Sequence, residues 1–437
     1  MGREQSITGL SDLDRSQLAA VAREYLLAGQ LMDRAGMPHI IAEFGREVMG
    51  DIAVDEWMGA SPIYTRRIQQ LLGFGNGDVE TIFKGMQFDI GAPPEFMDFR
   101  YNITDANHGE FWLDHCGALM DVEPMGDQYV TTMCHDIEDP TFDATATATN
   151  PRARMTAIHR PPREPADREP HCHWQVVIDE TVEPLPDPPQ MQPLLSARLL
   201  EVPVAKLNAG EGSEGSSEDD GWSDYTTPLD PDLRLEFFSK AALLALSDEV
   251  ALQCHLLVMA LVKAIERRAD TDMAIEIVAK QFIGSAALTA ERLAKELDLG
   301  TGLEAIAGVF AVHPSFRPAP YVDLQIDASG ATDDGELIVS LMDCPAVHEA
   351  DCDSWITILG AGNDVAIEAL AQAVDPHALS MEIDRLPGAI RSWRITLGDT
   401  PAERERSEVR LTRFSSGADF EFSEPVAVPV TVTTRSR

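Results

Sequence analysis

The sequence repeats itself at an offset of 225 residues, and this repeat constrains the fold more than any other feature of the 437-residue chain. The segment Met58–Gly77 lies over Ile283–Gly302 without a gap, and the same offset places Phe96–Asn102 on Tyr321–Asp327. Residues of the same or similar type coincide at Gly59/Gly284, Arg67/Arg292, Leu72/Leu297, Gly75/Gly300, Gly77/Gly302 and Asn150-Pro151/Asp375-Pro376. We therefore expect a duplication, whose copies pair within one chain as a pseudo-dimer or across a homodimer.

A change in composition separates the two copies. Residues 183–192 are rich in proline, and residues 208–224 are rich in glycine, serine and acids, which is typical of a flexible, self-repelling linker. The sequence thus predicts a first unit over residues 1–180, a linker over 181–228 and a second unit over 229–437.

Within each unit, the hydrophobic period changes from helical to strand-like. In the first unit, helices are expected over Gln17–Phe44, Val48–Met58 and Tyr64–Leu72. Strands are expected over 96–104, 109–116, 129–134, 154–158 and 172–178, with a short helix that Asp139 caps and Pro140 opens, and Asp364 is expected to cap its counterpart. Each unit is therefore predicted to be a helical bundle followed by an antiparallel sheet with one crossing helix, an α+β fold.

The charge excludes some partners. With 73 acidic and 34 basic residues, the formal net charge is −39, so nucleic acid and anionic membranes are not expected partners. The acidity agrees with high-salt adaptation or with codon bias. The first ten residues lack a signal-peptide pattern, and Ala241–Ile265, the longest apolar region, is interrupted by polar residues. A cytoplasmic location is expected.

Cysteine and histidine concentrate in one part of the first unit. Between residues 108 and 173 lie six of the eleven histidines and three of the six cysteines. These side chains bind zinc and similar metals, although no pair has CxxC spacing. Strand alternation would place Cys116 on the face of Asp114 and Trp112, and Cys172 opposite His171 and His173. Either the cysteines or the histidines can therefore point toward one metal ion, but not both sets. We predict that Cys116, Cys134, Cys172 and His159 bind a divalent transition metal, zinc being favoured and iron or an iron–sulfur cluster possible. Scattered core thiols and surface histidines are the alternative.

The second copy lacks these residues. In the repeat register, Cys134 and His135 correspond to Leu359 and Gly360. Alignment on the two tryptophans places Cys172 and His173 on Arg391 and Ser392. The sequence therefore predicts a single functional site in the first unit and a degenerate second unit.

The order of motifs in the first unit resembles the L-2-amino-thiazoline-4-carboxylic acid hydrolase-like family and its uncharacterised relatives. The resemblance covers about residues 13–179 and rests on the order of the motifs Cys116, Cys134-His-Asp, Asn150-Pro151-Arg152, Pro161-Pro162 and Cys172-His-Trp174, preceded by GMPHIIAEFGREVMGDIAVDEW. The family's Cys-Pro-Pro-Asp element reads Arg160-Pro161-Pro162-Arg163 here, so a cysteine and an acid are missing. The resemblance implies opening of a small heterocycle by water.

The leading functional hypothesis is a metal-dependent, hydrolase-like enzyme that acts on a C–N bond of a small heterocycle or amide. The metal would activate water or polarise the substrate, and Asp136, Glu138 or His135 would move the proton. In a metal-free variant, Cys134 or Cys172 would act as a thiolate nucleophile. Two alternatives stay open: a non-catalytic ligand-binding or sensory protein with a structural zinc or iron–sulfur site, and an accessory subunit of a larger complex.

Overall fold

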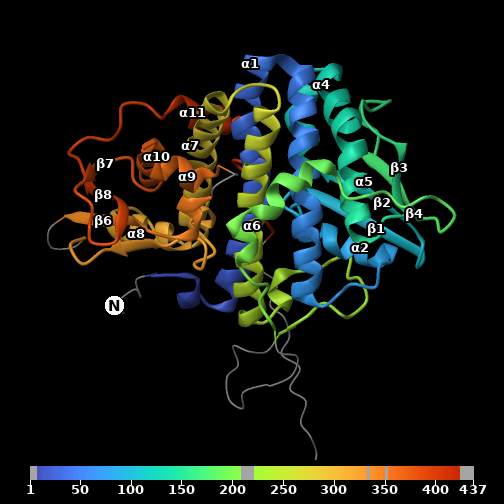
Figure 1. Cartoon of the computed structure of the whole chain (residues 1–437), viewed down its shortest axis with the longest axis horizontal. Coiled ribbons are helices and arrows are strands. Elements are labelled where there is room, and N and C mark those ends of the chain that lie inside the picture. The colour runs from blue at the N-terminus through green and yellow to red at the C-terminus, as the bar shows by residue number, and fades with distance from the viewer. Residues whose placement is uncertain (1–6, 208–220, 332–334, 350–352, 424–437) are drawn as a thin grey trace, which may run out of the picture.

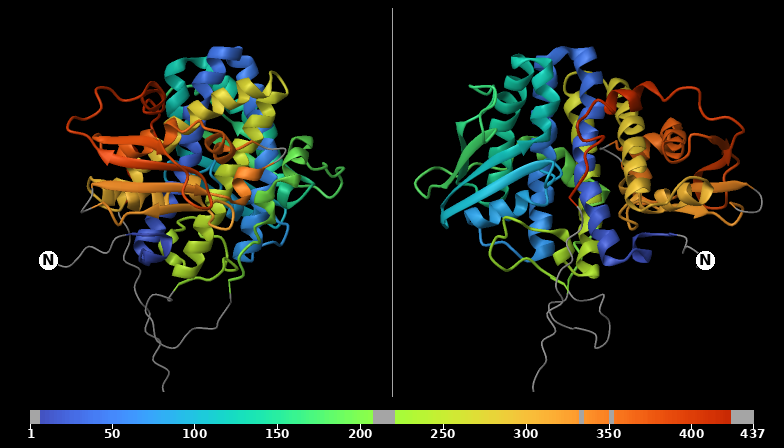
Figure 2. Two further views of the ribbon diagram at one scale, coloured as in Figure 1. Left: turned by 60° about the vertical axis from the view of Figure 1, so that its left-hand side comes forward. Right: turned by 180° about the vertical axis from the view of Figure 1, so that it is seen from behind.

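Long helices form the centre of the molecule, and one antiparallel sheet lies on either side of them (Figure 1). The computed structural model describes residues 7–207, 221–331, 335–349 and 353–423. The central helices are α1 (Arg15–Leu72), α6 (Lys240–Glu266) and α7 (Thr271–Glu296), and α1 packs against both of the others. Figure 2 shows the same arrangement from two further sides.

Helix α1 is two helices joined at Gly45, whose φ of 80° is non-helical. Its two parts correspond to α6 and α7 at the repeat offset. The caps follow the same register, because Asp14 accepts a hydrogen bond from the Gln17 N–H and Ser239 accepts one from the Ala242 N–H. Each cap satisfies a backbone donor that the first helical turn leaves free.

The two sheets have the same strand order. The first contains β1 (Met97–Asp105), β2 (His108–Cys116), β3 (Ala153–His159) and β4 (Cys172–Ile178), in the order β1-β2-β4-β3. The second contains β5 (Leu324–Asp327), β6 (Glu336–Met342), β7 (Ala378–Ile383) and β8 (Ala389–Leu397), in the order β5-β6-β8-β7. Helix α5 (Glu138–Thr149) packs on α1, and α10 (Val365–Val374) packs on α7. The predicted α+β fold with two similar units is confirmed.

Reciprocal ion pairs join the two units. Arg67 contacts Glu249 at 2.7 Å, and Arg292 contacts Glu24 at 2.6 Å. Each arginine and each glutamate lies 225 residues from its counterpart. In an isologous interface, the same patch is used by both partners. The two units therefore pair within this chain as the subunits of a twofold dimer do.

The expected strand over 129–134 is wrong. That segment belongs to α4 (Asp127–Thr131) and to a π-helical stretch, Thr132–Ile137, which runs into α5. Val130 and Cys134 are both buried and lie four residues apart, which is helical spacing. The cap predicted at Asp139 is also wrong, because Asp139 lies inside α5. Asp364 does stand at the N-cap position of α10, but its carboxylate accepts the Trp393 indole N–H and makes no capping hydrogen bond.

Short helices that the sequence interpretation did not locate complete the two units. They are α2 (Val79–Met86), α3 (Gly117–Val122), α8 (Leu303–Val312), α9 (Trp355–Gly360) and α11 (Ser407–Thr412). Part of the predicted linker packs on the core, since Pro189–Ser196 and Arg198–Glu201 form 3-10 turns that bury Met191, Leu194 and Leu199. Residues 208–220 of that linker lie outside the described residues.

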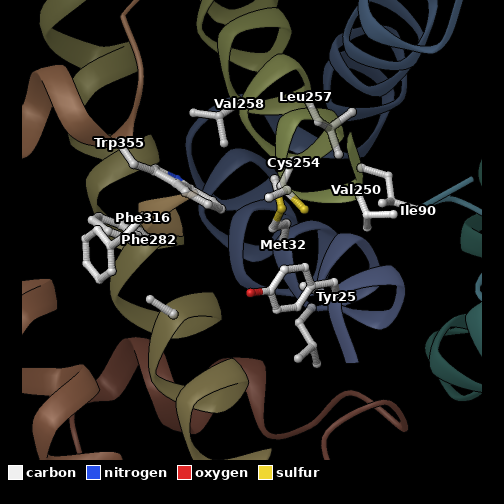
Figure 3. Packing of buried hydrophobic residues seen from close by; sticks show 14 of the residues in the cluster. Tyr25, Met32, Ile90, Val250, Cys254, Leu257, Val258, Phe282, Phe316 and Trp355 are labelled. Carbon is white, nitrogen blue, oxygen red and sulfur yellow. The ribbon is translucent and has the colours of Figure 1, made fainter. Parts of the chain in front are cut away.

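The core lies mainly where α1, α6 and α7 meet (Figure 3). Helices α6 and α7 are long and apolar enough to cross a membrane, but 89% and 78% of their most apolar windows are buried inside the molecule. Buried core helices of this length pass the same test. Cys254 on α6 is buried among these core residues.

Candidate functional site

A bulge in the first sheet and a π-helical stretch next to it place the three candidate cysteines near one another. The pairing of β1 with β2 shifts so that Asp114 has no partner, and this bulge puts Cys116 on the buried side with Leu113. Strict alternation had placed Cys116 with Trp112 and Asp114, which is wrong for this reason. Cys134 in the π-helical stretch and Cys172 at the start of β4 interact with Cys116 and with Glu138.

These cysteines are buried thiols. Burial, followed by the nearby Glu138 carboxyl, raises the pKa of Cys116 to about 12 and the pKa values of Cys134 and Cys172 well above the usual range. The Cys116 sulfur also accepts the Leu119 backbone N–H at 3.3 Å, as the N-cap of α3. The thiolate is the reactive form of cysteine. Because burial disfavours the thiolate, this environment does not activate any of the three cysteines as a nucleophile.

We expect iodoacetamide to label Cys116, Cys134 and Cys172 only slowly in the native protein at pH 7, because the thiolate fraction is small and the sulfurs are buried. Peptide mapping by mass spectrometry, with urea-unfolded protein as the control, measures this. Rapid native labelling of Cys134 or Cys172 would instead support a thiolate nucleophile.

The remaining predicted site residues point elsewhere. A bulge between Ala157 and His159 places His159 beside His173, with ring centroids 6.1 Å apart, on the sheet face opposite Cys172. His135 bonds to the Pro161 carbonyl at 2.7 Å, and Asp136 is exposed. Within the described ranges, no group of three or more His, Cys, Asp or Glu side chains is placed to hold a metal ion. The zinc or iron site stays a prediction, which elemental analysis of the purified protein would test.

A largely apolar cavity of about 350 Å³ lies mainly in the first unit, and Glu138, which neighbours these cysteines, lines it. Both halves of α1 line it, together with β1, α5 and α11. Its wall contains the methionines Met37, Met49, Met86, Met97, Met125, Met133 and Met155. Methionine is flexible and polarizable, and it adapts to varied apolar surfaces. We call this space the α1 cavity.

Asp33 and Glu56 form a buried carboxyl pair at the wall of the α1 cavity. Asp33 lines the cavity, and Glu56 faces Asp33 from the other half of α1. Glu56 is fully buried, and neither of its carboxyl oxygens has a hydrogen-bond partner within the described part of the chain. Burial raises the pKa of both groups, and Asp33 further raises the pKa of Glu56, while the Trp57 side chain bonds to Asp33. Two neighbouring buried carboxyls disfavour being ionised at the same time.

Two more acids line the cavity. Asp89 accepts hydrogen bonds from the Tyr64 hydroxyl at 2.8 Å and the Gly91 N–H at 2.7 Å, and burial raises its pKa to about 6. Burial raises the pKa of Glu138 to about 8, although the positive charge of Arg160 lowers it by a smaller amount. Glu138 is thus mainly protonated at pH 7, and its Oε2 atom is enclosed without a hydrogen-bond partner among the described residues. Of the predicted catalytic residues, only Glu138 reaches this cavity.

No motif in the sequence marks Asp33, Glu56 or Asp89 as site residues. A signal was present, however, in the repeat. At the same register, the second unit has Val258, Gln281 and Pro314 in place of these acids. The two copies therefore differ in charge at these three positions.

In the second unit, a tryptophan occupies the space that corresponds to the α1 cavity. The Trp355 ring stacks on Phe282, with ring centroids 4.9 Å apart, and lies edge-on to His255, with centroids 6.1 Å apart. Its indole N–H donates a hydrogen bond to the Gln281 side-chain oxygen at 3.2 Å. By the repeat offset, these three neighbours correspond to Trp57, Gln30 and Glu56. Figure 3 shows Trp355 reaching from α9 toward α6 beside Phe282. One unit thus keeps the space open, and the other fills it.

Comparison with family models, curated proteins and solved structures finds no match to this chain. The likeness to the thiazoline hydrolase-like family stays a prediction from the order of motifs.

Proposed function

We propose that the first unit binds a small, mostly apolar organic molecule in the α1 cavity and moves protons with the carboxyl groups of its wall. The observation that carries this proposal is the Asp33–Glu56 pair, two neighbouring buried acids beside an apolar space. Buried titratable groups with strongly altered pKa values, placed in a cavity, are typical of functional sites. Conservative core packing would favour neutral side chains, as Val258 and Gln281 of the second unit illustrate.

Hydrolysis of a C–N bond in a small heterocycle or amide is the reaction that we propose for this site. A carboxylate at Asp33 would accept a proton from water while the hydroxide oxygen bonds to the substrate carbon. Glu138, protonated at neutral pH, would donate its proton to the departing nitrogen as the C–N bond breaks. Both residues line the same cavity. Two groups with different protonation states are the usual basis of such acid–base catalysis.

We expect Ala53→Phe to abolish binding of the neutral fluorescent ligand N-phenyl-1-naphthylamine. Ala53 is buried on α1 and lines the cavity, so a phenyl ring there takes up space that the ligand needs. Fluorescence titration measures the affinity, and thermal unfolding followed by circular dichroism checks that the variant folds. The control is Ala241→Phe, the same change at an exposed position of α6. Unchanged binding in folded Ala53→Phe would contradict the proposed cavity.

Catalysis is tested separately with a panel of cyclic amides and thiazolines, their hydrolysis being followed by liquid chromatography and mass spectrometry. Any turnover by the wild type should fall at least ~100-fold in Glu138→Gln, which removes the proton donor. Retained ligand binding without turnover of any compound would favour the non-catalytic binding protein.

A further inference from the structure

We infer that the natural occupant of the α1 cavity carries a protonated amine at one end of an apolar body. The inference deepens the proposed function and rests on it. It starts from the charges of the cavity wall, where four acids and a single base lie among apolar residues: Asp33, Asp89, Asp121, Glu138 and Arg34. A charged ligand entering such a wall must be matched by the opposite charge, because burial of an unpaired ion is costly.

The one base is already engaged. Arg34 lies 3.6 Å from the Asp121 carboxylate, and Asp121 also accepts hydrogen bonds from Ser415 and Ser416 next to α11. The Arg34–Asp121 pair is therefore neutral as a unit and is held in place by the C-terminal segment. Among the described residues of the wall, it leaves no free positive charge for a carboxylate ligand.

Asp33, Glu56 and Asp89, by contrast, form no ion pair within the described residues, although the charge of Arg34 lowers the pKa of Asp33 against the larger effect of burial. Asp33 and Glu56 are at least nine-tenths buried, and within the described residues neither forms an ion pair. Asp89 has only the Tyr64 hydroxyl and the Gly91 N–H as neutral donors. With Asp89 ionised at pH 7, this side of the cavity is negative. An ammonium group supplies both the missing charge and hydrogen-bond donors.

The rest of the wall suits the body of such a molecule. The aromatic rings of Trp57, Phe99, Tyr129 and Phe142 line the cavity with the methionines. Aromatic faces attract cations, and aromatic and thioether side chains accommodate alkyl chains. The cavity thus fits an amphiphilic amine better than an alcohol or a carboxylic acid of the same length.

Isothermal titration calorimetry of the full-length protein with 1-octylamine, 1-octanol and octanoate tests this inference. At pH 7 and about 0.15 M salt, where long-range attraction to the acidic surface is screened, we expect octylamine to bind at least ~10-fold more tightly than octanol, and octanoate to bind most weakly. The double variant Asp33→Asn/Asp89→Asn should lose this preference while still binding octanol. The control is Asp272→Asn, at an exposed acid on α7.

Each other outcome overturns a stated part of the account. If octanol or octanoate binds as tightly as octylamine, or if only the naphthylamine ligand binds, the amine inference is wrong and the cavity proposal stands. If Ala53→Phe binds octylamine like the wild type, the amine is held at the acidic surface and the inference is wrong. If neither the naphthylamine ligand nor any octyl compound binds, the proposed function itself fails.

Discussion

Replacing Trp355 with alanine is expected to destabilise the protein by about 3–5 kcal/mol and to create a second cavity that binds indole. The ring is 3% exposed and packs on Phe282 and His255. Its removal also leaves the Gln281 carbonyl oxygen without the indole N–H donor. Added indole has the shape and the donor of the missing ring. It should therefore restore part of the lost stability, as ligands that bind only the native state do.

Urea unfolding with and without indole measures this effect. Trp112→Ala serves as the matched control, because Trp112 lies on the outer face of β2 and its removal creates no enclosed space. Indole should stabilise Trp355→Ala and leave both the wild type and Trp112→Ala unchanged. If indole does not stabilise Trp355→Ala, the second unit has no cavity equivalent to that of the first.

Replacing Glu56 with glutamine, the residue that the second unit has at this position, is expected to stabilise the protein increasingly as the pH rises. Burial and Asp33 raise the folded-state pKa of Glu56 well above its unfolded value. The stability associated with the protonated form is complete below the unfolded pKa, near 4.5, and is lost as the pH rises toward the folded pKa. Glutamine does not titrate, so the variant escapes this loss. Its advantage in free energy of unfolding should be about 1 kcal/mol or more at pH 8.

Urea unfolding at pH 5, 7 and 8.5 shows whether the difference grows with pH. Gln281→Glu makes the mirror-image change, since it introduces a buried carboxyl at the equivalent place in the second unit, and it should become less stable as the pH rises. A difference between wild type and Glu56→Gln that is the same at all three pH values would show that Glu56 does not carry the proposed proton.

Much of the fold could be predicted because the same pattern of caps, helices and strands occurs in both copies of the repeat. The 225-residue register held from the caps Asp14 and Ser239 to the strands β3 and β7, since each pair of positions meets the same backbone requirement. The segment 129–134 was misread as a strand because a short run of apolar and β-branched residues does not distinguish a strand from a buried helix. Only its burial at four-residue spacing decides between them.

The candidate site was harder to predict. The concentration of cysteine and histidine in the sequence led to Glu138 and to the three buried thiols. Two β-bulges determine which of these side chains share a face of the sheet. The bulges are not visible in the sequence. Asp33 and Glu56 lie on the two halves of α1, on either side of the break at Gly45. Their contact depends on how that helix folds back on itself. In a chain with 73 acidic residues, the sequence does not distinguish Asp33 and Glu56 from the other acids. Only the structure shows that these two are buried together.

The most direct test of the central claim is an experimental structure of the protein crystallised with 1-octylamine. The account predicts one molecule per chain, in the α1 cavity, with its nitrogen within hydrogen-bond distance of Asp33 or Asp89 and its alkyl chain against the methionines. The space around Trp355 should hold no ligand. An empty or collapsed α1 cavity, or an amine bound only at the acidic surface, would contradict the account.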